Sequence, residues 1–230
     1  MGTCRILSRS DELFHDRVEA GQLLAQAVIT VHPVRPVVLG IPRGGVIVAR
    51  ELAHALDAPL DIIVARKLGA PGNPELAIGA VSEDGRLFLD EQVARAVGAD
   101  RAHIEEEREC QMREIARRAA LYRHMRAKVP LQGRTAIVTD DGVATGATTQ
   151  AALRAVRQEQ PARLVLAVPV GPEHTLEGLA KDADEVLCLR APAFFAAVGQ
   201  FYECFTQTEE EELLAILREE AARAGGAGRA

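Results

Sequence analysis

Two adjacent carboxylates, Asp140 and Asp141, follow the apolar run 136–139 and precede a small turn rich in glycine and threonine, Ala144–Thr148. The apolar run is typical of a buried strand, and the residues after the turn favour a helix. Backbone N–H groups and hydroxyls at a helix N-terminus form a cradle for a phosphate group. Carboxylates repel phosphate, but they suit ribose hydroxyls or a metal ion that arrives with the ligand. The segment therefore predicts a site for a ribose 5-phosphate.

The order of strand, paired acids, T-G-x-T turn and helix resembles the motif with which type I phosphoribosyltransferases bind 5-phosphoribosyl 1-pyrophosphate (PRPP). The resemblance implies that the 5-phosphate and ribose contact a continuous set of residues: Asp140, Asp141, Gly142, Val143, Ala144, Thr145, Gly146, Ala147 and Thr148. The commoner phosphate loop G-x-x-x-x-G-K-[ST] is absent, because no lysine follows Gly146. The alternative is a tight strand-to-helix turn with solvated acids. Within the family, the chain is most similar to uncharacterised bacterial members.

A second unusual stretch, Pro42–Gly45, offers one cation and two residues that lack a Cβ atom. A backbone approaches a pyrophosphate closely only where side chains are missing. The stretch resembles the family's pyrophosphate loop, which implies that Arg43, Gly44 and Gly45 bind pyrophosphate. The family often has a cis peptide in this loop, and the resemblance implies that it joins Arg43 and Gly44. An ordinary glycine turn is the alternative interpretation.

Lys67 and Glu75 are the candidate catalytic residues, and both assignments come from the resemblance. The family places a lysine at the end of the second strand, where Lys67 would contact the pyrophosphate and stabilise charge on the leaving group. The turn-rich span 68–75 corresponds to the family's mobile catalytic loop, in which Glu75 would deprotonate or orient a nucleophile. The alternatives are a surface lysine and a solvent-exposed carboxylate.

Apolar runs alternate with helical patterns along most of the chain. Strands are expected at 37–41, 60–65, 134–139, 163–168 and 185–189, and helices at 14–29, 46–56, 147–158 and after Pro172. This alternation predicts an α/β fold, a Rossmann-like and mostly parallel sheet with helices on both faces. Ligands bind beyond the carboxyl ends of such strands, which meet at one edge of the sheet. We therefore expect Pro42–Gly45, Arg66–Lys67 and Asp140–Thr148 to line one cleft.

The region between the second and third of these strands has a different pattern. Asp84–Gly85, flanked by the apolar runs 77–81 and 86–89, predicts a β-hairpin. A short helix at 90–97 and a long, highly charged helix at 100–126 follow. Glutamates and arginines at helical spacing in the long helix indicate a solvated face. The sequence offers no function for this helix, although a dimer interface is one hypothesis.

At 230 residues the chain suits a single domain, which we place at 1–224 with a core of about 37–190 and a disordered tail at 225–230. Five of the eight aromatic residues fall at 194–205, and the segment 191–206 is a candidate hood. Family members often stack the acceptor base on an aromatic ring of such a hood. Phe195 and Tyr202 are the candidates for that contact, and a core role is the alternative for most of these rings.

The net charge of −6 provides no basic field, so neither nucleic acid nor a membrane surface is an expected partner. No apolar run is long enough to cross a bilayer, and residues 1–10 lack the apolar core of a secretory signal. The four cysteines are scattered, as is typical of reduced thiols, and the histidines lack zinc-site spacing. These patterns predict a cytoplasmic protein, and the family resemblance predicts a homodimer.

The resemblance implies a Mg²⁺-dependent phosphoribosyltransferase. It would move ribose 5-phosphate from PRPP to a nitrogen of a small-molecule acceptor, a nucleobase, and release pyrophosphate. Mg²⁺ would be held mainly by the pyrophosphate, with Asp140 and Asp141 as the candidate protein ligands. The alternative is a non-catalytic regulatory protein that binds PRPP or a nucleotide.

The chain departs from one pattern of the family. Purine salvage enzymes that act on the ring at N7 usually carry an acid just before the Thr-Gly of the motif, and here that position is Ala144. A hypoxanthine- or guanine-type mechanism is therefore disfavoured. The small residue is more similar to adenine- or orotate-type members, but no motif in the sequence identifies the acceptor.

Overall fold

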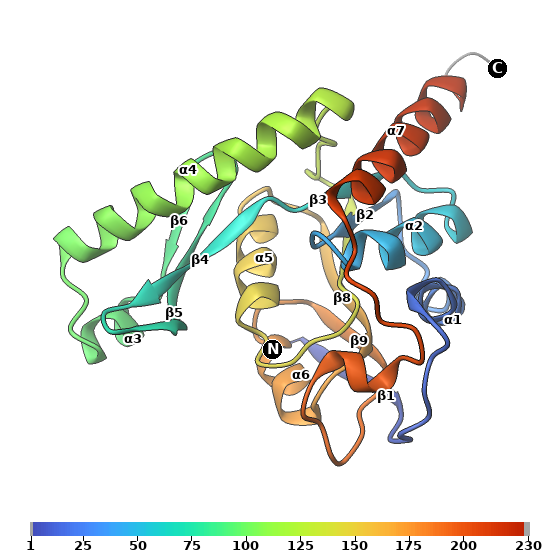
Figure 1. The fold of residues 1–230 in the computed structure, drawn as a ribbon, viewed down its shortest axis with the longest axis horizontal. Helices are drawn as coiled ribbons and strands as arrows, with labels where there is room; N and C mark the ends of the chain where they lie inside the picture. The colour runs from blue at the N-terminus through green and yellow to red at the C-terminus, as the bar shows by residue number, and fades with distance from the viewer. Residues whose placement is uncertain (1, 228–230) are drawn as a thin grey trace.

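The computed structural model describes residues 2–227, with side chains for residues 2–74 and 76–223. At its centre lies a sheet of six strands in the order β1-β9-β8-β7-β2-β3, in which every neighbouring pair is parallel. The strands are β1 (Thr3–Ser8), β2 (Pro36–Gly40), β3 (Leu60–Ile62), β7 (Thr135–Thr139), β8 (Arg163–Val170) and β9 (Glu185–Arg190). The predicted parallel α/β architecture is confirmed (Figure 1).

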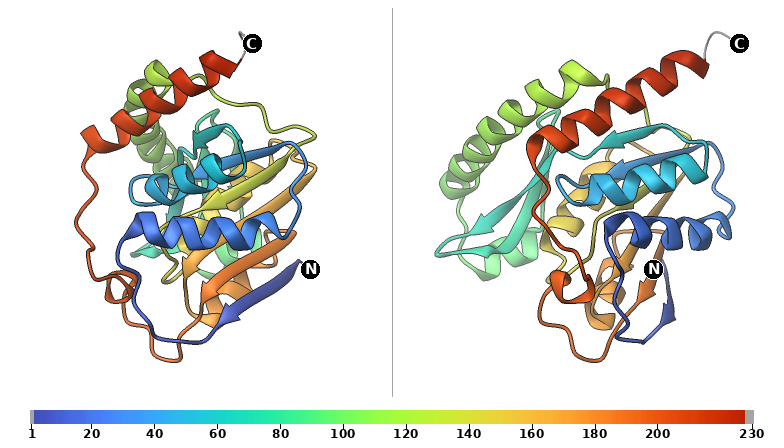
Figure 2. Two further views of the ribbon diagram at one scale, coloured as in Figure 1. Left: turned by 90° about the vertical axis from the view of Figure 1, so that its right-hand side faces the viewer. Right: turned by 45° about the vertical axis from the view of Figure 1, so that its right-hand side comes forward.

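Helices cover both faces of this sheet. Helices α1 (Arg17–Ile29) and α2 (Gly45–Ala55) pack on one face, as the left view of Figure 2 shows, and α5 (Ala147–Arg157) and α6 (Glu173–Leu179) pack on the other. Strand β7 shows why its sequence is continuously apolar: Ile137 joins the core below α1 and α2, whereas Ala136 and Val138 join the core below α5 and α6. A strand buried on both faces needs no polar alternation.

The edge strand β1 was not expected from the sequence. Its six residues alternate between exposed and half-buried positions, and the strand pairs with β9 along one side only. An edge strand with one neighbour buries little apolar surface, so its sequence lacks the hydrophobic run that marked the central strands.

A second, smaller sheet of three antiparallel strands projects from the side of the molecule. It contains β4 (Ala65–Ala70), β5 (Asn73–Ser82) and β6 (Leu87–Leu89), and is followed by α3 (Glu91–Ala96) and α4 (Arg101–Met125). We call residues 65–125 the arm; it lies to the left of the central sheet in Figure 1. The predicted hairpin and the long charged helix are confirmed. The helix buries only Ile115 and Tyr122, in agreement with a largely solvated surface.

The arm corrects two predictions. The expected strand 60–65 ends at Ile62, and Ala65 already begins the second sheet, so Arg66 and Lys67 do not lie at the end of a parallel strand. The expected mobile loop 68–75 is mostly two paired strands joined by a short turn at Gly72. The pairing of β4 with β5 shifts register beside Gly69, and such irregularities accommodate glycine within a strand. The turn-forming residues therefore mark a bulged hairpin and not a loop.

The C-terminal part of the chain returns across the strand ends. The segment 191–206 contains a short 3₁₀ helix, η1 (Val198–Phe201), and α7 (Glu210–Ala227) then packs against α2 and α4. The predicted disordered tail is wrong for residues 225–227, which continue α7, while residues 228–230 lie outside the described residues. Within residues 2–227, no helix combines the length and apolar character needed to cross a membrane.

Candidate functional site

The turn after β7 has the shape that the sequence predicted. Gly146 has a φ of +80°, and a Cβ atom there would lie 2.8 Å from the Cγ2 atom of Thr175. Both the backbone conformation and the close approach therefore require glycine. The Val143 N–H group donates to the Val170 carbonyl at 2.9 Å, and the Thr175 hydroxyl donates to the Ala144 carbonyl at 3.1 Å. These contacts fix the turn against β8 and α6.

The same turn presents backbone N–H groups without partners. Among residues 2–227, no acceptor forms a hydrogen bond with the backbone N–H group of Ala144, Thr145 or Gly146. The first hydrogen bond of α5 is donated by the Gln150 N–H group to the Gly146 carbonyl at 2.7 Å. Ala144 and Thr145 are exposed. Unpaired N–H groups at the positive end of a helix favour an anion, so the geometry suits a phosphate.

Asp140 and Asp141 lie beside the turn and are half-buried. An Asp140 carboxylate oxygen accepts the Asp141 N–H group at 2.9 Å, and Asp141 Oδ2 accepts the Nε–H group of Arg17 at 2.7 Å. Burial raises the pKa of both carboxyl groups, and the neighbouring charge of Asp141 raises the pKa of Asp140 further. The guanidinium of Arg17 opposes this effect at Asp141. The site therefore holds two half-buried carboxyl groups side by side, which favour ligands that bring hydroxyl donors or a cation.

The Pro42–Gly45 loop packs directly on these acids. A Cβ atom on Gly44 would collide with the Asp141 carboxylate, and one on Gly45 would lie 2.7 Å from the Asp140 Cα atom. The two glycines therefore let the loop backbone reach the carboxylates, as the sequence predicted. The structure contains a cis peptide in this loop, but it joins Pro42 to Arg43, so the assignment to Arg43 and Gly44 is wrong by one bond. The two glycines predicted where the loop lies, but not which of its peptide bonds is cis.

A pocket of about 280 Å³ lies beside the loop, and Lys67 is one of the residues that line it. Pro42, Lys67 and Thr148 all line it, although Lys67 comes from β4 of the arm and not from the central sheet. The structure thus brings together all three segments that were expected in one cleft. The backbone of Glu75 lies in β5, but its side chain is outside the described residues.

Arg17 is a site residue that sequence reasoning missed. Its side chain is 9% exposed, and besides Asp141 it donates to the Thr206 carbonyl at 2.8 Å and lies 3.9 Å above the Phe205 ring. It is the first residue of α1, directly after the N-cap Asp16. The chain has many arginines, and no motif or spacing in the sequence distinguishes Arg17 from the others. Only the fold shows that it lies beside Asp141.

The two hood candidates have different surroundings. Tyr202 is 5% exposed, its hydroxyl donates to the Asp141 carbonyl at 2.5 Å, and Phe205 stacks on its ring at 5.1 Å. Tyr202 as an acceptor contact is therefore wrong, because its ring is covered and its hydroxyl is already used. Phe195 lines a second pocket of about 740 Å³ and remains a candidate.

The two pockets lie on opposite sides of the phosphate turn. The smaller pocket is bounded by the ends of β2 and β3, and the larger one by Pro172 and α6 on the β8 side. Because β7 lies between β2 and β8 in the sheet, the turn that follows β7 separates the pockets. A ligand on the turn would therefore border both pockets.

Comparison with known proteins agrees with this geometry. The family model described as phosphoribosyl transferase domain matches residues 18–203. The "Putative phosphoribosyl transferase Rv0571c" of Mycobacterium tuberculosis is 48% identical over 206 residues, which are 90% of this chain and 46% of that protein. The chain therefore spans about half the length of the curated relatives it matches.

A solved structure is also similar along most of the chain. The crystal structure of TT1426 from Thermus thermophilus has a TM-score of 0.86 and 47% sequence identity, and the match covers 90% of this chain and 98% of that one. The family resemblance expected from the paired acids and the phosphate turn is thereby confirmed. The chain belongs to the phosphoribosyl transferase domain family.

Proposed function

We propose that the protein is a Mg²⁺-dependent phosphoribosyltransferase that moves ribose 5-phosphate from PRPP to a nitrogen atom of a nucleobase and releases pyrophosphate. One observation carries the proposal. The phosphate turn, which follows the paired acids, lines two pockets, one lined also by the cation Lys67 and the other by Phe195. A displacement at the ribose needs this arrangement, because the nucleophile must approach from the side opposite the leaving group.

In this proposal each part of PRPP has its own set of donors or acceptors. The 5-phosphate binds the N–H groups of Ala144–Thr148, and the ribose hydroxyls donate to Asp140 and Asp141. Arg43, the Gly44–Gly45 backbone and Lys67 hold the pyrophosphate. The bond from C1 to the pyrophosphate oxygen breaks and its electron pair leaves with the pyrophosphate. The acceptor nitrogen bonds to C1 and loses its proton, for which Glu75 is the candidate base. Positioning and stabilisation of the leaving group supply the catalysis.

The residues present fit a magnesium ion that arrives with the substrate. Among the residues that the structure describes, no group of three or more histidine, cysteine, aspartate or glutamate side chains forms a metal cage. Mg²⁺ in phosphate-binding sites is commonly bound by one or two carboxylates together with substrate phosphates. Asp140 and Asp141 are the carboxylates that would hold it here, and its charge would neutralise part of the pyrophosphate.

The larger pocket is the proposed acceptor site. It combines the Phe195 ring with polar side chains such as Gln150 and His174, which suits a flat base with apolar faces and a polar edge. Ala144 supplies no carboxylate there, so the acceptor nitrogen would not be deprotonated from this position. Glu75 stays the candidate group to orient the nucleophile. The homodimer and the cytoplasmic location also stay predictions.

Calorimetric titration with PRPP, with and without Mg²⁺, followed by a screen of nucleobases for pyrophosphate release, tests the proposal. We expect binding that tightens with Mg²⁺ and release of pyrophosphate with at least one base. PRPP that binds but is recovered intact with every purine and pyrimidine base would favour the non-catalytic regulatory protein. Absence of PRPP binding under both conditions would contradict the transferase and a regulator that binds PRPP, and would leave only a regulator that binds a nucleotide.

A further inference from the structure

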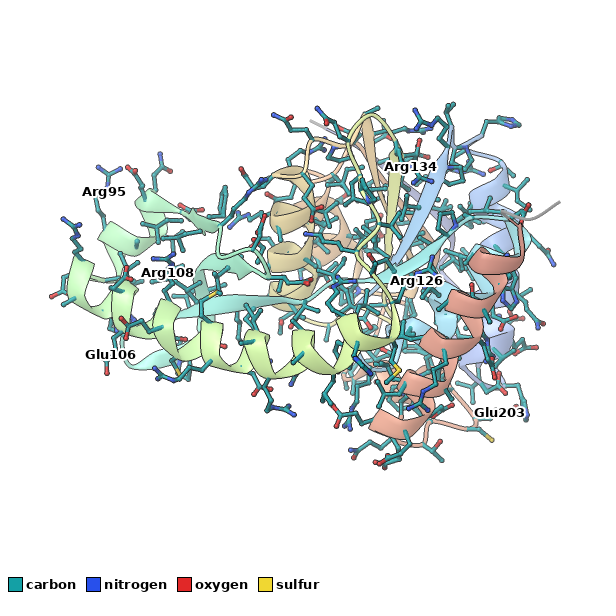
Figure 3. The ribbon with its side chains drawn as sticks, turned by 90° about the horizontal axis from the view of Figure 1, so that it is seen from above. Arg95, Glu106, Arg108, Arg126, Arg134 and Glu203 are labelled. Atoms are coloured by element: carbon teal, nitrogen blue, oxygen red, sulfur yellow. The ribbon has the colours of Figure 1, made fainter. Side chains whose placement is uncertain are left out.

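Helix α4 forms one wall of the pocket beside the Pro42–Gly45 loop. The strand ends and β4 line the rest of this pocket, and α4 contributes four residues: Glu107, Gln111, Arg118 and Tyr122. The figures show how the helix reaches this place, since α4 runs along the whole arm and its C-terminal end approaches the central sheet (Figures 1 and 3). The wall is therefore made by the part of the chain for which the sequence indicated no function.

The hydroxyl group of Tyr122 has no hydrogen bond to a described residue. The residue as a whole is 2% exposed and lines the pocket, but its hydroxyl oxygen is not among the fully buried atoms that lack a partner. The hydroxyl is therefore accessible from the pocket. Burial raises the pKa of this hydroxyl, so it stays protonated and able to donate. The charges of Arg118, Arg117 and Arg43 oppose this rise in pKa and that of Glu210 adds to it, and of these four residues only Arg118 lines the pocket.

Arg118 has donors to spare beside Tyr122. Its Nε–H group donates to Glu114 at 2.7 Å, whereas its terminal nitrogens have no hydrogen bond to a described residue. Arg66 faces the same pocket and is held at Nε by Gln111 at 3.0 Å. Among the side chains that the structure describes, the cations Arg66, Lys67 and Arg118 line the pocket against one acid, Glu107, in a chain whose net charge is −6. Such a local excess of cationic donors suits an anion with several oxygens.

Other charged side chains of α4 do not line this pocket. Glu106 points away from the arm into solvent, while Arg108 lies toward the hairpin and donates to the Gly85 carbonyl at 3.3 Å (Figure 3). Arg117, adjacent to Arg118, pairs with the same Glu114 at 3.1 Å but does not line the pocket. The helix therefore presents only a few of its charged side chains to the pocket.

We propose that Tyr122 and Arg118 of α4 bind the pyrophosphate group of PRPP, so that the long helix completes the leaving-group site. The inference rests on the proposed function, because it assigns a chemical role to a pocket of the same site. Both residues act as hydrogen-bond donors to pyrophosphate oxygens, which gain negative charge as the bond to C1 breaks. The hydrogen bond from Arg66 of β4 to Gln111 of α4 holds the two walls of the pocket together.

Three variants test the assignment by calorimetry with magnesium pyrophosphate and, separately, ribose 5-phosphate. Tyr122→Phe removes only the hydroxyl, and we expect pyrophosphate to bind about tenfold more weakly. Arg118→Met removes a charged donor, for which we expect a loss of about ten- to a hundredfold. Arg117→Met is the matched control, since it also removes a partner of Glu114, and it should leave both affinities unchanged. Ribose 5-phosphate should bind all three variants as it binds the wild type.

The two ligands distinguish failure of this inference from failure of the proposed function. If wild-type protein binds both ligands but Tyr122→Phe and Arg118→Met retain its pyrophosphate affinity, the α4 assignment is overturned and the proposed function stands. Binding of ribose 5-phosphate without pyrophosphate also overturns the assignment of the pocket. If neither ligand nor PRPP binds, the proposed function fails together with it. Thermal melting checks folding, and Tyr122→Phe, which keeps the packed ring, decides the question even if Arg118→Met does not fold.

Discussion

The two sides of the candidate site are built on different principles. The sheet side uses two continuous segments, Pro42–Gly45 and Asp140–Thr148, which supply acids and backbone N–H groups at the ends of neighbouring strands. The arm side uses side chains from two elements, Lys67 on β4 and Arg118 and Tyr122 on α4. These elements are far apart in the sequence but lie side by side in the arm (Figure 1).

This difference explains which half of the site is visible in the sequence. A backbone cradle needs glycines and small residues at fixed positions, because a single Cβ atom would close it. Recognition by long side chains needs only that two elements pack against each other, and it leaves no characteristic spacing. The sheet side therefore carries a motif, whereas the arm side becomes apparent only in three dimensions.

The largest effect should come from the acids of the sheet side. In Asp140→Asn/Asp141→Asn the ribose hydroxyls lose two charged acceptors, and we expect PRPP affinity to fall about a thousandfold. Calorimetric titration with PRPP measures it. The matched control is Glu105→Gln/Glu106→Gln, which removes the same number of charges from the surface of α4 and should leave the affinity unchanged. Equal PRPP affinity in the two double variants would contradict the role of the acids.

Arg17 is expected to have the next largest effect, on stability. Arg17→Met leaves the Asp141 carboxylate buried without its ion-pair partner, and we expect the free energy of unfolding to fall by about 4 kcal/mol. Urea denaturation measures the change. Adding Asp141→Asn to this variant should recover part of the loss, since no unpaired charge remains. A double variant that is as unstable as the sum of the two single variants would show that the ion pair is not the cause.

Much of the fold was predictable because burial on both faces makes central strands continuously apolar. Strand β7 and the other inner strands were located in this way, and turn chemistry located the hairpin at Asp84–Gly85. Strand β1 was missed because an edge strand buries too little. The span 68–75 was misassigned because glycine and proline occur in bulged strands as well as in loops.

The same reasoning explains the outcome for the candidate site. The predicted meeting of three segments in one cleft is confirmed. Right-handed crossovers explain it for the two segments at the ends of β2 and β7, whereas Lys67 reaches the pocket from β4 of the arm, for a reason that the sequence did not indicate. Arg17 was missed because its contact with Asp141 joins residues remote in sequence. Tyr202 was misplaced because an aromatic residue near a site has the same sequence signature whether its ring is open or covered.

One glycine from each side of the site, Gly146 and Gly72, allows a comparison with smaller expected effects on stability. Gly146 and Gly72 both have positive φ values, +80° and +71°, but only at Gly146 would a Cβ atom meet a close neighbour. We expect Gly72→Ala to lower the free energy of unfolding by about 1 kcal/mol, from the backbone alone. Gly146→Ala adds the clash with Thr175 and should cost about 2–3 kcal/mol. If urea denaturation shows that both variants lose the same free energy of unfolding, the phosphate turn relaxes around the added Cβ atom and is not rigid.

The smallest effects on stability are expected at two helix N-caps, one on each side of the site, and the two caps should differ in their effect on PRPP binding. Asp16 accepts the Glu19 N–H group at 2.9 Å at the start of α1, and Asp100 accepts the His103 N–H group at 2.8 Å at the start of α4. Replacing either with alanine should lower the free energy of unfolding by about 1 kcal/mol.

The effects on PRPP affinity should differ between the two variants. The Asp16 cap positions the adjacent Arg17 against Asp141, whereas Asp100 caps the end of α4 that is remote from Arg118 and Tyr122. We therefore expect Asp16→Ala to weaken PRPP binding severalfold and Asp100→Ala to leave it unchanged. If Asp100→Ala weakens binding as much, the whole of α4 acts as one rigid wall, and the two sides of the site depend equally on long-range packing.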